Sequence, residues 1–272
     1  MNMFQIKRFG IRIAEWVGEE TIAFLEGVGN GGVLLVESAY WIFFGVREKQ
    51  VVRIDAIIEE MMEIGIRSIP IIALLSGTIS VTLTIQGIYT LRVFGAESQV
   101  TYGIGFSIVR EFAPLITGVL VAGRSGSALA ARIGTMKINQ EIDALKVMGI
   151  NPTRFLVVPS LIAMLIMVPL LTFLADIVGL LLAGLYVNAE LGISMAAYMH
   201  QMINFIGVND IFFGLLKSVI FAMEITVIAV VNGAAVTGGA EGVGNATTRA
   251  VVQSITAIVL TAMLVVLIST RI

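Results

Sequence analysis

Three charge-free intervals constrain the fold of this chain more than any other feature. They cover residues 68–91, 155–175 and 250–270, and charged residues lie on both sides of each. An α-helix needs about 20 apolar residues to cross about 30 Å of hydrocarbon, and each interval is that long. Only 13% of the 272 residues are charged, against about 25% in an average soluble domain. We therefore expect an all-α integral membrane protein.

Two further spans are predicted, and both contain charged residues. One covers about residues 99–123 and includes Arg110 and Glu111, and the other covers about 211–236 and includes Lys217 and Glu224. Because charges are costly in lipid, these side chains should face the protein interior or a cavity. At 1.5 Å per residue, Arg110 lies about 15 Å and Lys217 about 9 Å from the outer helix ends. They could form one polar layer with Glu111, either as a structural ion pair or as a lining for a charged or zwitterionic substrate.

The distribution of basic residues predicts the orientation of the five spans. Residues 1–67 contain seven basic residues and residues 124–154 contain five, whereas residues 92–98 contain one and residues 188–210 none. Basic loops stay on the cytoplasmic side of a membrane. We therefore expect a cytoplasmic N-terminus, a cytoplasmic segment between the second and third spans, and a C-terminus outside.

The first 67 residues do not contain a span and are expected to form a cytoplasmic or interfacial amphipathic segment. Residues 33–46, "VLLVESAYWIFFGV", are apolar but too few to cross a bilayer. Residues 51–67 have the pattern of an amphipathic helix that leads into the first span. The predicted division is therefore an N-terminal segment, residues 1–67, and a five-helix membrane domain, residues 68–272. The glycine-rich residues 237–250 are expected to form a turn before the last span.

The segment between the second and third spans has the pattern of a short amphipathic helix. Four apolar residues are spaced for one helical face, namely Ile138, Ile142, Leu145 and Met148. Gly149 and Pro152 should end this helix. On the pattern alone, the helix could rest on lipid headgroups or dock in a groove of a soluble partner. Upstream, small residues are expected to allow close helix packing, namely Gly123, Gly126, Ala130 and Gly134.

The sequence carries little sign of chemistry of its own. It has no cysteine and one histidine, which excludes thiolate sites and histidine metal clusters. No nucleotide-binding G-x-x-x-x-G-K-[ST] motif is present, so ATP hydrolysis by this chain is not expected. The net charge of −2 gives no reason to expect a nucleic-acid partner. No catalytic residue, metal site or cofactor is predicted.

Residues 110–159, "REFAPLITGVLVAGRSGSALAARIGTMKINQEIDALKVMGINPTRFLVVP", closely resemble the signature of MlaE-type permeases, the membrane subunits of MCE-associated phospholipid ABC transporters. The resemblance extends to "GTISVTLTIQG" in the first span and to "LKSVIFAMEITVIAVVNG" in the fourth. It implies an interfacial N-terminal helix, five transmembrane helices and a location in the bacterial inner membrane. It also implies a second copy of the chain, an ABC ATPase dimer that binds the ATP, a ring of MCE-domain proteins and, in some complexes, a STAS-domain subunit.

The resemblance also assigns roles to residues. The cytoplasmic coupling helix would cover about residues 139–148, with contacts to the ATPase from Asn139, Glu141, Ile142, Asp143, Leu145 and Met148. The phospholipid cavity would be lined by Leu83, Gln86, Thr90, Leu91, Phe94, Arg110 and Glu111, and Lys217 matches a basic position of the family pattern. The chain departs from that pattern at Arg132, at Asn139 and Gln140, and at Glu224, so the polar network and the ATPase contact could differ in detail.

The function expected from these features is that of a permease subunit in an ATP-driven phospholipid transporter, acting in lipid trafficking or outer-membrane lipid asymmetry. The main alternative is an ion-coupled secondary transporter or channel that uses Arg110, Glu111, Lys217 and Glu224. An intramembrane enzyme and a structural scaffold are further alternatives. The docking helix and the missing nucleotide motif favour the first function, because a secondary transporter needs no such helix.

Overall fold

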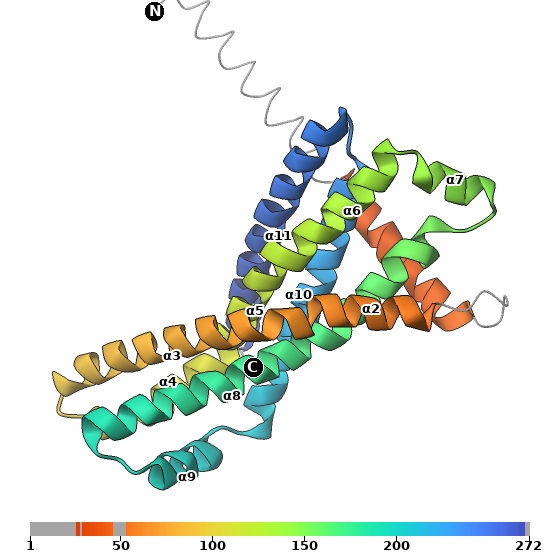
Figure 1. Ribbon diagram of the computed structural model, residues 1–272. Helices are drawn as coiled ribbons and strands as arrows, with labels where there is room; N and C mark the ends of the chain where they lie inside the picture. The colour runs from red at the N-terminus through yellow and green to blue at the C-terminus, as the bar shows by residue number, and fades with distance from the viewer. Residues whose placement is uncertain (1–25, 28, 46–52, 270–272) are drawn as a thin grey trace, which may run out of the picture. The chain divides into compact units, whose positions relative to one another are not determined.

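The computed structural model describes residues 26–27, 29–45 and 53–269, and Figure 1 shows its helices. All regular secondary structure in these ranges is helical. Five helical segments are long and apolar enough to cross a membrane, namely Ile54–Arg92, Val100–Ile138, Thr153–Leu191, Val208–Ala234 and Gly239–Ser269. For the described residues, the expectation of an all-α membrane protein with five spans is confirmed.

Contacts divide the chain into two units, Met1–Val51 and Val52–Ile272, which we describe separately. In the first unit, residues 29–44 form a helix that exposes Val33, Val36 and Phe43. Residues 1–25 of the predicted amphipathic segment lie outside the described residues. The interfacial role of residues 1–67 therefore stays a prediction. The second unit begins earlier than residue 68, because α2 (Ile54–Ile64) packs against the third span.

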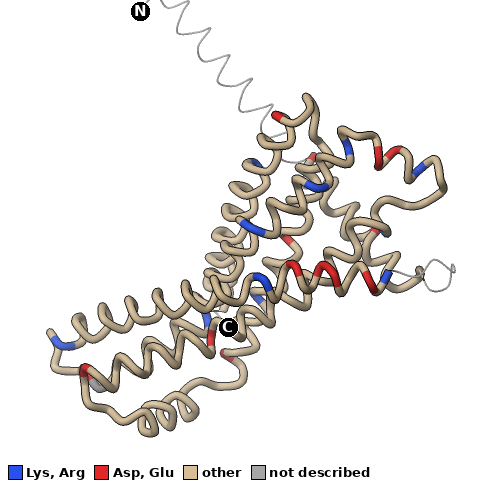
Figure 2. The backbone as a smooth tube through the Cα atoms, viewed as in Figure 1, with Lys and Arg blue, Asp and Glu red and all other residues tan. Residues whose placement is uncertain are grey.

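The first span closely matches its predicted bounds. Helix α3 (Ile69–Arg92) has 24 residues, about 36 Å at 1.5 Å per residue, and is free of charge until Arg92 (Figure 2). Pro70 lies in its first turn, where the missing N–H costs nothing. Buried residues recur every four positions along α3, from Ile72 to Ile88, and the helix packs against the third span. Three of these residues are Ser76, Ser80 and Thr84.

The second span is longer than predicted. It consists of α4 (Val100–Ser107), a π-helical turn (Ile108–Phe112), α5 (Ala113–Val121), a second π-helical turn (Ala122–Gly126) and α6 (Ser127–Ile138). Residues 124–138 are thus helical, although they were expected in a loop. Their low apolar content was misleading, because many of their small and polar side chains contact other helices instead of water.

The third span also continues beyond its charge-free interval. After a π-helical turn (Thr153–Val157), α8 (Val158–Leu191) has 34 residues and contains Asp176, which is only 5% exposed. Helix α8 packs against α2, α3 and α5. The carboxyl group that ends the charge-free interval in the sequence is therefore buried in the middle of this helix.

The last three helices complete the unit. Helix α9 (Met195–Phe205) connects α8 to α10 (Val208–Ala234), and α10 packs against α6, α8 and α11 (Gly239–Ser269). The glycine-rich segment was expected to be a turn, but only residues 235–238 are non-helical and α11 begins at Gly239. That expectation was wrong because Gly134 of α6 packs closely against Val236 and Val243, which supports the first turns of α11. The short helices α7 (Glu141–Val147) and α9 lie at opposite ends of the unit (Figure 1).

Candidate functional site

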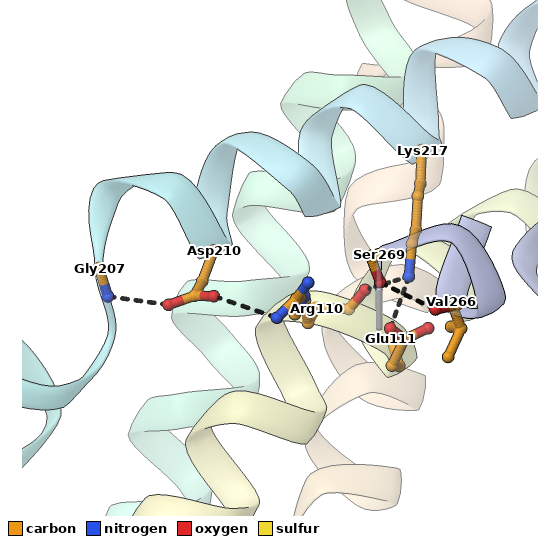
Figure 3. Close-up of polar contacts among 7 residues, drawn as sticks. All are labelled: Arg110, Glu111, Gly207, Asp210, Lys217, Val266 and Ser269. Carbon is orange, nitrogen blue, oxygen red and sulfur yellow. Dashed lines mark hydrogen bonds and ion pairs between the residues drawn. The ribbon is translucent and has the colours of Figure 1, made fainter. Parts of the chain in front are cut away.

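The interior polar site begins where Pro114 interrupts the second span. Proline has no N–H to donate to the carbonyl of Arg110, four residues earlier. The ammonium of Lys217, on α10, donates to that carbonyl at 3.0 Å and to Oε1 of Glu111 at 2.6 Å (Figure 3). The π-helical turn that carries Arg110 and Glu111 is a local departure from α geometry of a kind common at functional sites. Lys217 therefore supplies the carbonyl of Arg110 with the donor that Pro114 lacks.

A glycine allows α10 to approach this turn. A Cβ atom at Gly214 would lie 2.4 Å from the carbonyl oxygen of Val109, which is closer than real Cβ contacts come. Gly214 precedes Lys217 by one helical turn, so the same close approach brings the lysine to its acceptors. The Lys217 side chain is 3% exposed and that of Glu111 is 35% exposed. The ion pair thus joins a buried cation to a carboxylate that other molecules can reach.

Arg110 points to a different partner from the one expected. Its guanidinium lies 3.6 Å from Oδ1 of Asp210 and over the rings of Phe106 and Phe213, at 4.9 and 5.3 Å from their centroids. The backbone N–H of Gly207 donates to Oδ2 of Asp210 at 3.0 Å, which caps the start of α10 (Figure 3). The sequence pattern assigned Asp210 to the outer loop. An acidic residue three positions after Gly207 is, however, a helix-start signal that could have placed it on α10.

Glu224 does not belong to this layer. It lies seven residues after Lys217 on α10, about 10 Å further along the axis. Its Oε1 accepts a hydrogen bond from the hydroxyl of Thr261 on α11. The four charges of the predicted polar set therefore separate into the Lys217–Glu111 pair, Arg110 with Asp210, and Glu224 with Thr261.

The predicted cavity residues of the first span lie away from the core of the unit. Gln86, Thr90 and Phe94 are exposed, whereas Leu83 and Leu91 are half-buried. The buried residues of α3 lie on another face, which packs against α8. In a single chain, the predicted lipid-contacting face of α3 is therefore open.

Helix α7 is shorter than the predicted coupling helix. Asn139 caps the end of α6, and Gln140 has a φ of 59°, a left-handed conformation that separates the two helices. Ile138 therefore ends α6 and does not share a helical face with Ile142. Gly149, with a φ of 73°, ends the segment as expected, since its N–H bonds to Lys146 and that of Ile150 to Leu145.

The exposed apolar residues of the α7 region match the predicted face only in part, because Ile138 and Met148 are exposed and Leu145 is not, while the exposed Val147 lay outside that face. Leu145 is 8% exposed, whereas Val147 is 89% and Met148 64% exposed. Of the polar residues assigned here, the amide of Asn139 donates to Glu141 and the ammonium of Lys146 pairs with Asp143. Helix α7 packs against α6, and Val147 at its end and Met148 just after it point outward.

Three of the four small residues assigned to close packing have tight contacts. A Cβ at Gly126 would lie 2.9 Å from Ile225, and one at Gly134 would lie 2.8 Å from Val236. Ala130 is fully buried, with its carbonyl against Gly233. Gly123 differs from the expectation, because a Cβ added there would have nothing within 4 Å. It is exposed within this chain.

Comparisons with known proteins place the chain among membrane permeases. The family described as Permease MlaE matches residues 57–268. The chain is 32% identical over 249 residues to a probable ABC transporter permease protein of Rickettsia typhi, covering 90% of this chain and 92% of that one. It is 38% identical over 202 residues to a probable ABC transporter permease protein of Synechocystis sp., covering 74% and 76%. It is 32% identical over 241 residues to the intermembrane phospholipid transport system permease protein MlaE of Haemophilus influenzae, covering 88% and 90%.

Proposed function

The chain belongs to the MlaE permease family, and we propose that it is the membrane subunit of an ATP-driven phospholipid transporter in a bacterial inner membrane. The observation that carries the proposal is the polar site inside the spans, where a buried lysine and a stacked arginine accompany partly exposed carboxylates. Cations can hold a lipid phosphate, and carboxylates can hold an ammonium. Charges of both signs at this depth therefore suit a phospholipid headgroup.

A second copy of the chain would complete the lipid cavity. The face of α3 with Gln86 and Thr90, together with Phe94 just after the helix, is open in one chain, and an enclosed site needs a further wall. Two copies facing each other across this surface would enclose a cavity with an apolar lining for acyl chains. Glu111, which is 35% exposed, and Arg110, which is 20% exposed, are the charged groups of this site that the lipid would reach.

ATP hydrolysis would occur in partner ATPase subunits that dock on α7. The sequence has no nucleotide-binding motif, and α7 presents Val147 and Met148 outward. Helix α7 packs on α6, which is continuous with the helix that carries Arg110. Movement of α7 would therefore tilt the second span. The π-helical turns at Ile108–Phe112 and Ala122–Gly126 are the points at which that span would bend.

The remaining partners and the orientation follow from the same proposal. With α7 in the cytoplasm, the N-terminus is cytoplasmic, and α9 and the C-terminus are periplasmic. An MCE-domain ring would lie on the α9 side and receive or deliver the lipid, in support of outer-membrane lipid asymmetry or trafficking. A STAS-domain subunit would join on the ATPase side, and neither a cofactor nor a nucleic acid is needed by this chain.

The ion-coupled alternative receives less support. It would use Arg110, Glu111, Lys217 and Glu224 as one site, but Glu224 bonds to Thr261, about 10 Å along α10 from Lys217. It also gives no role to the outward apolar residues of α7.

Co-purification tests the ATPase part of the proposal. The tagged wild-type chain should co-purify with an ATPase subunit, and Glu141→Lys or Val147→Asp should weaken this association. Val147 replaces Leu145 as the test position, because Leu145 is buried and Leu145→Asp would disturb folding. Lys137→Asp, on α6 before the break at Gln140, is a charge-change control. If no ATPase accompanies the wild-type chain, the proposal fails.

Bound lipid tests the substrate part. Arg110→Ala should lower the amount of phospholipid that co-purifies with the assembled complex, measured by mass spectrometry after extraction. Arg92→Ala removes an exposed arginine at the outer end of α3 and should leave the bound phospholipid unchanged. Unchanged lipid in Arg110→Ala would identify the interior site as a structural ion-pair network only.

A further inference from the structure

A second polar site lies between α2, the second span and α8. It is a cavity of about 260 Å³ whose polar lining comes from Glu60, Glu63, Arg124, Ser125, Arg132 and Ser160. Figure 2 colours the acidic residues of α2 red and the basic residues of the second span blue, and members of both groups line the cavity. The volume is below the roughly 300–1,000 Å³ of small-molecule sites, so it suits a compact polar group.

The cavity lining contains two glutamates and two arginines, and some of their hydrogen-bonding groups have no partner within the part of the chain that the structure describes. Arg132 donates to Glu60 and, at 2.9 Å, to the hydroxyl of Ser160. Glu63 binds Arg67 with one oxygen, while its other oxygen lies 3.8 Å from Arg124. That distance is beyond a hydrogen bond.

Arg124 therefore has donors to spare. It donates to the hydroxyl of Ser68, and a guanidinium has five N–H groups. Among the described residues, the carboxylate that pairs with Arg124 is that of Glu63, at 3.8 Å. A ligand with phosphate oxygens could accept from the remaining donors of Arg124, in the fork geometry that arginine provides.

The cavity lies at the depth of a headgroup layer, by two independent counts. Its α2 residues directly precede α3, which is about 36 Å long and crosses the apolar core. Arg124 lies 24 residues from Val100 at the other end of the second span, again about 36 Å away. Arg110 is 14 residues from Arg124, about 21 Å along the helix, so this cavity is separate from the interior polar site.

We propose that this cavity holds the phosphoammonium headgroup of a bilayer phospholipid, with Arg124 and Arg132 at the phosphate and Glu63 at the ammonium. Two arginines and two glutamates line the cavity, with Arg67 paired to Glu63 outside the lining, so groups of both signs are present for the phosphate and the ammonium of a zwitterion. The acyl chains stay in the membrane, because the cavity is too small for them. This inference rests on the proposed transport function. The site would bind a lipid of the cytoplasmic leaflet before or after that lipid occupies the interior site.

A thiol at the cavity mouth tests the proposal. The chain has no cysteine, so Ala128→Cys, at an exposed position of the lining, introduces a single thiol. Its rate of modification by a maleimide is measured in detergent with dihexanoyl phosphatidylethanolamine, dihexanoyl phosphatidylglycerol, phosphoethanolamine or inorganic phosphate. We expect phosphatidylethanolamine to slow modification in a saturable way and the other three to do so much less. Equal protection by phosphate or phosphoethanolamine would identify a soluble-ligand site, and equal protection by phosphatidylglycerol would exclude charge matching; either overturns the proposal.

Variants in the Ala128→Cys background separate binding from folding. Arg124→Gln should raise the concentration of phosphatidylethanolamine needed for half-maximal protection about tenfold, the effect of losing one charge-assisted hydrogen bond. Arg124→Lys, which retains the charge, should raise this concentration by less than Arg124→Gln does. Arg92→Gln, at the opposite end of α3, should have no effect. No protection in the parent, or full protection in Arg124→Gln, overturns the proposal. ATPase co-purification and the phospholipid whose binding depends on Arg110 are measured on the same preparations. If both are unchanged while protection at Ala128→Cys fails, the cavity proposal is wrong and the transport function is still supported.

Discussion

Glu111→Leu should destabilise the protein more than Lys217→Met, although both changes break the same ion pair. The Lys217 side chain is 3% exposed, so Glu111→Leu leaves a buried ammonium without its counter-charge. Removing one partner of a buried pair costs about 3–5 kcal/mol. In Lys217→Met, the carboxylate that remains is 35% exposed and can be solvated. The main loss is then the donor to the carbonyl of Arg110, about 1–3 kcal/mol.

The double variant separates the cost of the unpaired ammonium from the cost of the unpaired carbonyl. With both charges removed, only the carbonyl of Arg110 lacks a donor, so Glu111→Leu/Lys217→Met should be about as stable as Lys217→Met alone. The measurement is equilibrium unfolding in mixed micelles with increasing SDS, followed by helical circular dichroism. Lys146→Met, which breaks an exposed pair on α7, is the control and should change stability by about 0.5 kcal/mol or less. Additive single effects, or a larger loss in Lys217→Met, would refute the argument.

Three further predictions concern packing and the α7 region. Val147→Asp changes an 89% exposed residue and should leave thermal stability nearly unchanged while lowering ATPase co-purification, whereas Leu145→Asp should lower stability itself. Gly214→Val should destabilise the protein by at least about 1–3 kcal/mol through overpacking, and Gly123→Ala should stabilise it by about 0.5–1 kcal/mol in the same unfolding assay. Gln140→Val should lower the melting temperature and Gln140→Gly should not, because only glycine adopts a φ of 59° freely. A stable Gln140→Val variant would mean that the break between α6 and α7 is not held by this residue.

Arg132 shows how a departure from a family pattern can acquire a physical role. In the sequence it is an isolated basic residue among small ones, with no feature that identifies its partner. In the structure it joins three elements, since its own helix α6 is tied to Glu60 of α2 and to Ser160 of α8. Those partners lie 72 and 28 residues away along the chain, so no local pattern could pair them.

The sequence predicted the first span almost to the residue, because charged residues lie at both ends of α3. The length of its charge-free interval defines the span without any contact to other helices. The sequence also allowed one polar layer of Arg110, Glu111 and Lys217. The structure pairs Glu111 with Lys217 and places Arg110 beside Asp210 instead. The sequence did not predict the ends of the second and third spans. Residues 124–138 and Asp176 look polar along the chain, but other helices bury or pair them.

What the sequence determined by itself is that the chain crosses a membrane several times and belongs with a known group of permeases. Length and lack of charge suffice for the first, because the cost of charge in hydrocarbon acts on each segment separately. The tertiary structure alone decided which charges meet: Arg110 with Asp210, Lys217 with the carbonyl freed by Pro114, and Arg124 beside a cavity with room for a ligand. These pairings depend on distances of a few ångströms between helices, set by close approach at residues such as Gly214, and such distances have no signature along a single chain.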